Sequence, residues 1–388
     1  MSFKDFVKLF GPAWIALMAD ADAASIIGGI STGEQYGYRM IWFVLILSIP
    51  LFFIQEASGK IGVITNSGIG KLIREYYSKN VSIIAIFPVF FIDFFTYLTE
   101  YTGIVIGSYL IGINPLIGLI IFFTLHIAIV LSKRYELTER ILILISLILI
   151  IASTIAIFPK LYFNESIFYF STSKSFLYYI AINIGAVVTP PCMLIYQSSS
   201  TAIKYSKIDV DQRTKIRWVS YETIIGSIIT EILIVFSEII GTGIGDINPL
   251  DPYQLILSLG YLHYIFGILL ISSAFLTLIV VSLSSSWGLL EALNKNNFRN
   301  MLKIYTLESI PAIIIVSFMI KKFSVVLNFA LTLLSLSPLV VTIPAILIGI
   351  ILSNRKIMKE NVYSRKRIII YYIIIILIAV GGIIGFIR

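Results

Sequence analysis

The chain contains eleven long apolar runs, and these runs restrict it to one class of fold. About 20 apolar residues span the hydrocarbon core of a bilayer as an α-helix. Hydrophobic residues make up 58% of the 388 residues and charged residues only 13%, which is more apolar surface than a soluble domain buries. The sequence predicts an all-α integral membrane protein, a single polytopic domain over residues 1–388. The expected helices cover residues 11–30, 41–59, 81–111, 114–132, 141–159, 176–202, 217–241, 255–290, 305–320, 323–353 and 368–387.

The 29 Lys and Arg residues are concentrated in alternate connections between these runs. With the N-terminus in the cytoplasm, 23 of them fall in inner segments and six in outer ones. Because basic loops stay on the cytoplasmic side, the bias predicts a plasma-membrane protein whose C-terminus lies outside. It also accounts for the net charge of +8 without nucleic acid as a partner. The lipid bilayer is the expected partner, and a monomer or weak oligomer the expected assembly.

Acidic residues lie within the apolar runs, where basic residues are nearly absent. Ionisable groups are costly inside a bilayer, and a pathway lined by acids attracts cations. Each acid has two interpretations: it handles a cation, or it is structural, hydrogen-bonded or neutral. The acids are Asp20, Asp22, Glu56, Asp93, Glu100, Glu231 and Glu238; His126 is the other titratable group expected in mid-membrane, and Lys60 is expected at a helix end.

Two consecutive prolines interrupt the sixth apolar run, in the segment Thr189-Pro190-Pro191. Prolines remove backbone donors and clash with the preceding turn, so this helix is expected to kink or unwind. Carbonyls freed by the break, such as those of Ala186 and Val187, then need partners, and a cation is one such partner. Broken helices at corresponding places in two halves of a chain point to a transporter's binding site.

Several motifs in the first half resemble those of the natural-resistance-associated macrophage protein (Nramp) transporters. Their order and spacing carry the resemblance, which runs from residue 11 to about residue 200 and weakens beyond. The motifs are Gly11-Pro12, Asp22, Gln35-Tyr36-Gly37-Tyr38 and Trp42, then Gln55-Glu56-Ala57-Ser58, Thr99-Glu100-Tyr101-Thr102-Gly103, and Gly185-Ala186 followed by Pro190.

The resemblance implies the LeuT-type fold, in which helices 1–5 and 6–10 form inverted repeats and helices 1 and 6 are broken at mid-membrane. A divalent metal ion would bind between the breaks as the transported substrate, and no other cofactor is expected. Asp22 takes the place of the metal-binding aspartate, Ser25 stands at an asparagine, and Ala186 matches the residue whose carbonyl faces the metal. Thr189 replaces the family's methionine, and Pro191 replaces its histidine.

These departures predict a site of hard oxygen ligands. A methionine sulfur favours Mn²⁺ and Fe²⁺, whereas oxygen ligands suit Mg²⁺, which tends to keep several waters. Asp20 supplies a second acid near Asp22, and the chain resembles a divergent Nramp-related branch associated with Mg²⁺ as well as Mn²⁺. Cys192 or Met193 would restore a sulfur ligand if helix 6 unwound differently, and Gln197 is a candidate contact for a hydrated ion.

Proton coupling is expected to be weak or rerouted, because Pro191 stands where the family has its histidine. Glu100 and His126 are the groups left to carry a proton, and Glu56 and Glu231 are further candidates for the pathway. The expected driving force is the electrochemical gradient of the metal itself.

Three alternatives remain open at this point. A LeuT-fold transporter of a small organic substrate, such as an amino acid, would meet a carboxylate with helix N-termini and few acids. An intramembrane enzyme could hold Mg²⁺ on Asp20 and Asp22 for diphosphate chemistry, but it would need a second acidic motif and facing bases. A structural or receptor-like protein would not account for the membrane acids. The sequence therefore favours a transporter over an enzyme.

Overall fold

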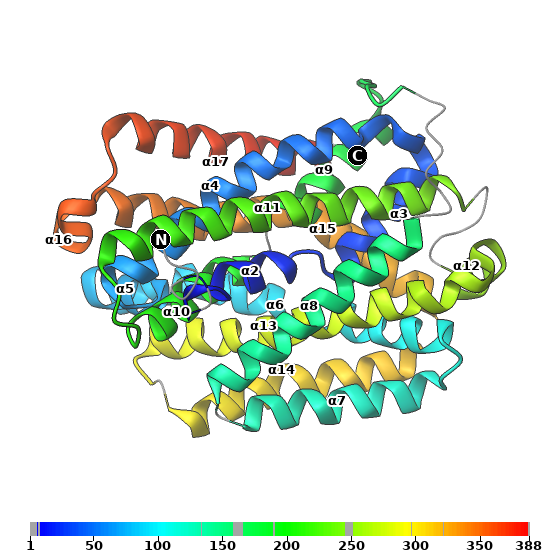
Figure 1. The fold of residues 1–388 in the computed structure, drawn as a ribbon, viewed down its shortest axis with the longest axis horizontal. Coiled ribbons are helices and arrows are strands. Elements are labelled where there is room, and N and C mark those ends of the chain that lie inside the picture. Colours follow the sequence, from blue (N-terminus) through cyan, green and yellow to red (C-terminus); the bar gives the residue numbers. More distant parts are fainter. Residues whose placement is uncertain are drawn as a thin grey trace.

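The computed structural model describes residue 6 and residues 8–132, 134–157, 166–188, 191–244, 251–295, 297–320 and 322–386. Throughout these ranges the regular secondary structure is helical (Figure 1). The α-helices are α2 (Pro12–Met18), α3 (Ala23–Tyr36), α4 (Ile41–Thr65), α5 (Ile69–Tyr76), α6 (Lys79–Leu110), α7 (Pro115–Leu131), α8 (Tyr135–Ile157), α9 (Lys174–Val187), α10 (Pro191–Tyr205), α11 (Gln212–Thr242), α12 (Pro252–Leu259), α13 (His263–Leu293), α14 (Phe298–Met319), α15 (Phe323–Ser353), α16 (Arg355–Met358) and α17 (Arg365–Phe386).

Nine helical segments of the described chain are long and apolar enough to cross a bilayer. One of them, Ala23–Thr65, holds α3 and α4, which are joined by the short 3₁₀ helix Gly37–Met40. The shorter apolar helix Pro115–Leu131 is a further expected span. The prediction of an all-helical membrane protein is confirmed.

The structure corrects two of the expected helices. The expected helix over residues 255–290 is two helices, because Gly260 adopts a positive φ of 55° and ends α12. The helix expected over 41–59 continues to Thr65 as α4 and ends at Asn66, which has a left-handed backbone. Lys60 is therefore inside the helix and 6% exposed, where its ammonium pairs with Glu56 at 2.5 Å instead of reaching the helix end.

Equivalent helices of the two halves make equivalent packing contacts. The third helices of the halves, α6 and α13, pack along each other, as do the second helices, α4 and α11. Helix α3 packs on α11 as α10 packs on α4, and α8 packs on α13 as α15 packs on α6. The short helices α5 and α12 also follow the second helix of each half. This correspondence is the packing expected of an inverted repeat.

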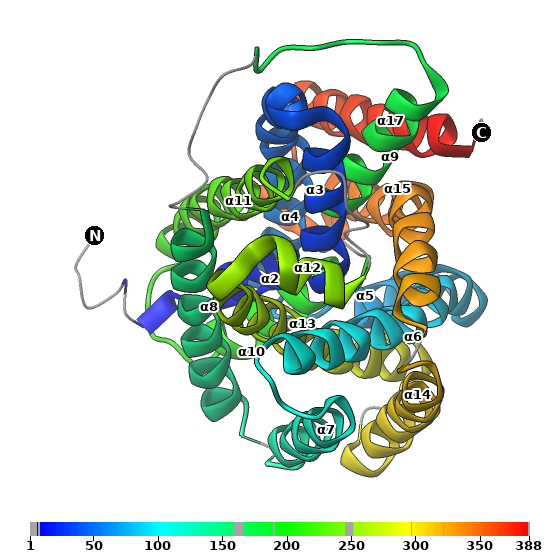
Figure 2. The same ribbon diagram turned by 90° about the vertical axis from the view of Figure 1, so that its right-hand side faces the viewer.

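The broken helices lie at the centre of the bundle. Viewed from the end, α2 and α13 lie inside, whereas α7, α14 and α17 lie at the periphery (Figure 2). Peripheral helices keep large apolar side chains exposed, among them Ile121 on α7, Phe318 on α14 and Leu377 on α17. Side chains of this kind on the outer surface suit contact with lipid tails.

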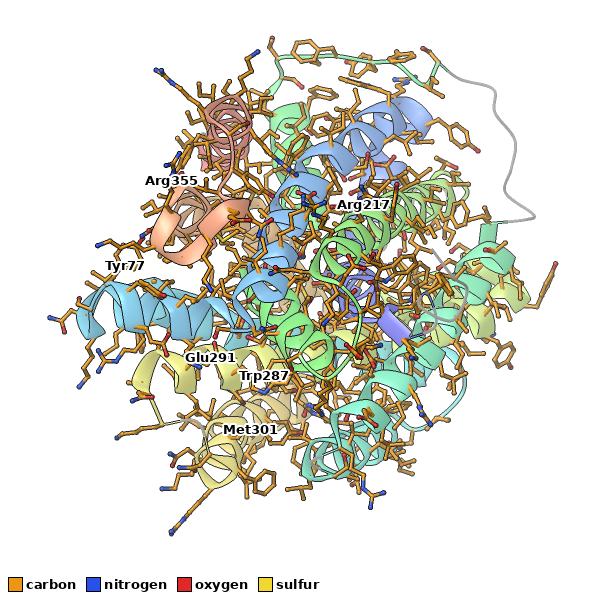
Figure 3. The ribbon with its side chains drawn as sticks, turned by 60° about the vertical axis from the view of Figure 1, so that its left-hand side comes forward. Tyr77, Arg217, Trp287, Glu291, Met301 and Arg355 are labelled. Carbon is orange, nitrogen blue, oxygen red and sulfur yellow. The ribbon has the colours of Figure 1, made fainter. Side chains whose placement is uncertain are left out.

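Basic segments that are far apart in the sequence gather at one end of the bundle. Arg217 at the start of α11 and Arg355 in α16 both lie at the end shown in Figure 3. Segregation of the basic segments to one end agrees with the charge alternation along the sequence.

Small residues allow the closest contacts between helices. Gly33 on α3 lies against the backbone of α11, and a Cβ atom there would overlap the carbonyl oxygen of Glu238. Because that neighbour is backbone, it cannot turn away as a side chain would.

We expect Gly33→Ala to lower the free energy of unfolding by about 1–3 kcal/mol, since overpacking forces the two helices apart. Thermal unfolding of the purified protein in detergent, followed by intrinsic fluorescence, would measure the change. Gly288→Ala is the control, because a Cβ at Gly288 would meet the flexible side chain of Ile195, 3.0 Å away. Equal melting temperatures for the two variants would contradict the prediction.

Candidate metal site at two helix breaks

The first helix is broken between Met18, the end of α2, and Ala23, the start of α3. Within lipid, backbone groups released by a break need partners inside the protein. Hydroxyl groups of two neighbouring helices, α11 and α13, donate to three carbonyls at this break. The pairs are Thr230 Oγ1 with Leu17 O at 2.7 Å, Thr277 Oγ1 with Ala19 O at 2.7 Å, and Ser273 Oγ with Ala21 O at 2.6 Å.

Asp22 caps the helix that follows the break. Its backbone is extended, and its Oδ1 accepts a hydrogen bond of 2.6 Å from the backbone N–H of Ser25. The side chain is buried, with 3% of its surface exposed. A carboxylate at a helix N-terminus is stabilised by the free N–H groups and by the helix dipole. Asp22 therefore places a carboxylate at the N-terminus of α3, directly after the break.

Glu100, on α6, reaches the same helix end. Its Oε2 accepts a hydrogen bond of 3.2 Å from the backbone N–H of Ala23, and its Oε1 accepts one of 3.2 Å from the hydroxyl of Thr99. Glu100 is completely buried. Two carboxylates therefore share the N-terminus of α3, and their combined charge favours a cation beside them.

The sixth helix is also broken, as the prolines predict. Helix α9 ends at Val187 and α10 begins at Pro191, while the expected ligand Thr189 lies outside the described residues. The hydroxyl of Ser25 donates to the carbonyl of Ala186 at 3.0 Å, so the two broken helices meet at this pair of oxygens. Ser337 on α15 donates to the neighbouring carbonyl of Gly185 at 3.3 Å.

A cavity of about 40 Å³ lies beside Asp22. Its volume is enough for an ion with little accompanying water. Its lining includes Asp22 but not Asp20, and it combines residues of both breaks with residues of α6 and α15. The lining residues are Asp22, Ala24, Ile92, Thr96, Thr99, Gly185, Pro191, Ala330, Leu333, Leu334 and Ser337.

The polar side chains that line this cavity all carry oxygen: Asp22, Thr96, Thr99 and Ser337. Within the described part of the chain, no group of three or more His, Cys, Asp or Glu side chains is arranged to hold a metal ion. Of the predicted oxygen ligands, Asp22 lines the cavity. The Ser25 hydroxyl and the Ala186 carbonyl hydrogen-bond to each other where the two broken helices meet, and they do not line it. The two sulfur candidates lie on α10, both buried, and neither Cys192 nor Met193 lines the cavity.

A comparison with known protein families shows to which family this chain belongs. The family model described as "Natural resistance-associated macrophage protein-like" matches residues 13–388, nearly the whole chain. The chain belongs to this family. The assignment extends the resemblance from the first half to the second, and it places the protein among transporters and not among enzymes.

Curated relatives of this Nramp-like protein include two divalent metal cation transporters named MntH. The one from Bacillus subtilis (strain 168) is 32% identical over 115 residues, 30% of this chain and 27% of the relative. The one from Verminephrobacter eiseniae (strain EF01-2) is 30% identical over 108 residues, 28% of this chain and 25% of the relative. The matched stretch thus spans about a quarter of each relative's length.

Solved structures share the fold at low sequence identity. A crystal structure of the Eremococcus coleocola manganese transporter, in complex with an aromatic bis-isothiourea substituted compound, superposes with a TM-score of 0.82. It is 15% identical to this chain, and the match covers 98% of this chain and 86% of that one. The inward-facing conformation of Mhp1 gives a TM-score of 0.52 at 16% identity, covering 97% and 88% of the two chains. These likenesses confirm the LeuT-type fold.

Four of the predicted pathway residues lie away from the cavity of this Nramp-like protein. Gln197 on α10 donates from Nε2 to Thr223 Oγ1 on α11 at 3.1 Å. His126 on α7 is buried, with Nδ1 3.1 Å from the hydroxyl of Tyr101 and Nε2 2.5 Å from that of Ser282. Both residues join helices by hydrogen bonds and do not line the cavity.

Glu56 belongs to an ion-pair cluster between α4 and α17. Its carboxylate pairs with Lys60 at 2.5 Å and with Arg367 at 2.7 Å, and it accepts hydrogen bonds from Ser220 at 2.8 Å and Tyr363 at 3.0 Å. Its charge is thereby compensated by two bases. The fourth residue, Glu231 on α11, is buried near Asp20 on another side of the first break.

The start of α2 is held by hydrogen bonds to Glu222, a residue to which the sequence assigned no role. Glu222 on α11 accepts hydrogen bonds at Oε1 from the backbone N–H groups of Gly11, at 2.7 Å, and Trp14, at 3.0 Å. Gly11 has a φ of 142°, which other residues rarely adopt, and a Cβ there would overlap the carboxylate of Glu139. The Gly-Pro pair before an apolar run was the available signal that this helix start is special.

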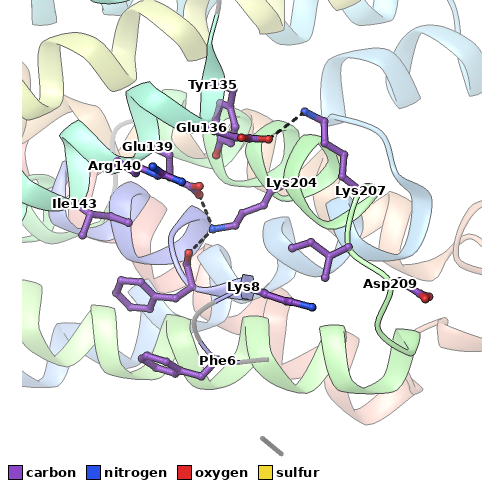
Figure 4. Close-up of a pocket in the computed structure, with 12 residues that line it drawn as sticks. Phe6, Lys8, Tyr135, Glu136, Glu139, Arg140, Ile143, Lys204, Lys207 and Asp209 are labelled. Carbon is purple, nitrogen blue, oxygen red and sulfur yellow. Dashed lines mark hydrogen bonds and ion pairs between the residues drawn. The ribbon is translucent and has the colours of Figure 1, made fainter. Parts of the chain in front are cut away.

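Lys204 on α10 completes the attachment of α2. Its ammonium binds the carbonyl of Phe10 and pairs with Glu139 on α8 at 3.0 Å, beside a groove of about 790 Å³ (Figure 4). Because α2 is the short half of a broken helix, these contacts fix its position relative to α8, α10 and α11.

Hydroxyl groups on α13 were also missed as parts of the site. Ser273 and Thr277 are four residues apart, so they share one face of the helix and reach the first break together. A hydroxyl-rich stripe at this spacing in an apolar run would have been the signal.

We expect Ser25→Ala to weaken binding of Mg²⁺ and Mn²⁺ about fivefold, because a neutral oxygen contact contributes about 1 kcal/mol. Isothermal titration calorimetry on the purified protein would measure it. Ser31→Ala is the matched control: Ser31 is buried on the same helix, and its hydroxyl has no hydrogen-bond partner among the described residues. Unchanged affinity in Ser25→Ala would remove this hydroxyl from the ligand set.

Proposed function

We propose that this Nramp-like protein transports divalent metal cations into the cell, with Mg²⁺ and Mn²⁺ as its ions. The observation that carries the proposal is the meeting of three oxygen groups at the two breaks: the Asp22 carboxylate, the Ser25 hydroxyl and the Ala186 carbonyl. The MntH relatives are named as divalent metal cation transporters, which supports the same class of ion.

The preference for Mg²⁺ and Mn²⁺ rests on the hardness of the ligands. Carboxylate, hydroxyl and carbonyl oxygens suit Mg²⁺ and Mn²⁺, whereas a thioether would favour softer ions. Thr189, at the position of the family's methionine, would add another oxygen. Asp20 and Glu100 add negative charge near the break, which raises the local concentration of cations.

A small organic substrate is a poorer fit to this site. Pockets for such ligands usually measure about 300–1,000 Å³, whereas the cavity at Asp22 measures about 40 Å³. Glu100 and Asp22 also place negative charge where an amino acid's carboxylate would need to sit.

The proposed orientation places the basic end of the bundle in the cytoplasm of the cell, with the C-terminus outside the plasma membrane. An inside-negative potential then drives uptake, since it is worth about 2.3 kcal/mol per charge per 100 mV and acts twice on a divalent ion. No histidine follows Thr189 where the family carries one, so the proposal makes this uptake independent of protons.

The test is uptake of Mg²⁺, Mn²⁺ and Ca²⁺ into proteoliposomes. We expect uptake of Mg²⁺ and Mn²⁺ by the wild type and a fall of more than about tenfold in Asp22→Ala, because the variant loses the ionised ligand. Asp209→Ala, at an exposed acid distant from the breaks, is the control and should transport as the wild type does. Absence of flux for every metal, from folded protein, would return the organic-substrate alternative to consideration.

A second measurement tests the coupling. With the metal gradient and the membrane potential held fixed, an imposed pH gradient should leave the initial rate of Mn²⁺ uptake unchanged, because protons do not share the step. Accumulation of Mn²⁺ against its gradient, driven by the pH gradient alone, would refute proton-independent uptake and make Glu100 the first residue to replace.

A further inference from the structure

Three buried acids lie on the side of the first break that faces α11. Asp20, Glu231 and Glu238 are each completely buried. Glu231 and Glu238 are seven residues apart, about two helical turns, so they share a face of α11. The charged groups that act on Glu231 are the carboxylates of Asp20 and Glu238.

Contacts along α11 show where Glu231 and Glu238 lie relative to the break in the first helix. Thr230, the neighbour of Glu231, donates its hydroxyl to the carbonyl of Leu17 at 2.7 Å, at the end of α2. Glu238 lies farther along, where its backbone carbonyl touches Gly33 of α3. Glu231 therefore lies beside the break, whereas Glu238 lies about two turns farther along α11, next to the middle of α3.

The carboxylates of Glu231 and Glu238 differ from the other acids near the breaks. All four of their oxygens are buried and accept no hydrogen bond from any residue the structure describes. Asp22, Glu100 and Glu222, by contrast, each accept a backbone N–H. A buried carboxylate without donors must be neutralised, either by a bound cation or by a proton.

We propose that Asp20 and Glu231 bind a monovalent cation of the Na⁺ class, at a site separate from the one at Asp22. Glu238 provides an intermediate position for this cation along α11. The Leu17 carbonyl places the two acids near each other, since it accepts hydrogen bonds both from the Thr230 hydroxyl, at 2.7 Å, and from the backbone N–H of Asp20, at 3.1 Å.

Burial favours a monovalent over a divalent ion at this second site. Mg²⁺ gives up its water reluctantly and usually keeps several water molecules. The three acids have no exposed surface and do not line the cavity beside Asp22 that could hold such water. A singly charged ion needs fewer charged ligands and loses less on dehydration.

Such an ion would connect α11 to the broken helix that carries Asp22. Because Asp20 and Asp22 belong to the same short unwound segment, occupancy of one site would bias the conformation of the other. Binding of the monovalent ion does not depend on the proposed metal substrate, whereas its coupling to transport does.

The test is binding of ²²Na⁺ to the purified full-length protein in detergent, measured by a scintillation proximity assay. We expect saturable binding by the wild type and an apparent Kd at least about tenfold higher in Glu231→Gln, which keeps the shape of the side chain but removes its charge. Glu308→Gln is the matched control and should bind as the wild type does, because Glu308 is a buried glutamate on α14 that accepts a hydrogen bond from Ser285 at 2.7 Å. Glu231→Asp keeps the charge and tests the same position if Glu231→Gln lowers the melting temperature; its shorter side chain should also weaken Na⁺ binding.

Mn²⁺ binding to the same preparations separates this proposal from the proposed function. Equal Na⁺ affinity in wild type, Glu231→Gln and Glu231→Asp would overturn the second site. So would an absence of saturable Na⁺ binding by wild-type protein that still binds Mn²⁺, or loss of Na⁺ binding in Asp22→Ala alone. Saturable, Glu231-dependent Na⁺ binding by protein that does not bind Mn²⁺ would support the second site and count against the proposed function only.

Discussion

The need to satisfy backbone groups inside the membrane governs the centre of this protein. A helix broken in lipid exposes carbonyls and N–H groups that water cannot reach. Here the hydroxyls of Thr230, Ser273 and Thr277 donate hydrogen bonds to carbonyls at the first break. The carboxylates of Asp22 and Glu100 accept hydrogen bonds from N–H groups at the start of the helix that follows. Three neighbouring helices, α6, α11 and α13, must therefore keep fixed positions around the break. The ion site and the inverted-repeat packing both depend on that requirement.

The same break separates acids with different surroundings. Asp22 and Glu100 are anchored by N–H donors at the start of α3, where a helix dipole favours negative charge. Glu231 and Glu238 have no such donors among the described residues, and they face the other side of the break. Glu56 and Glu139 are compensated by Lys60 and Lys204. Acids that look alike in an apolar sequence thus divide into those that accept backbone N–H groups, those without a donor among the described residues, and those that are ion-paired.

The short helix α2 is held by contacts that an ion could influence from a distance. Glu222 and Lys204 attach its N-terminal end to α11 and α10, while its other end leads into the unwound segment with Asp20 and Asp22. The groove of about 790 Å³ beside Lys204 lies where movement of α2 would alter the surface.

The sequence by itself determined the class of fold, the order of the apolar helices and the break in the sixth helix before Pro191, because length, hydropathy and proline chemistry act locally. The role of Asp22 as a ligand stays a prediction. The tertiary structure decided which acids share a site. Glu56 and Asp22 both lie in apolar runs, yet Glu56 is ion-paired, with Lys60 four residues away and with Arg367, 311 residues away. The contact with Arg367 could not be read from the sequence. The hydrogen bonds of Ser25 with Ala186 and of Thr230 with Leu17 likewise join helices distant in the chain. The hydropathy of the sequence indicates which segments are buried, whereas the packing of the helices decides which residues face one another.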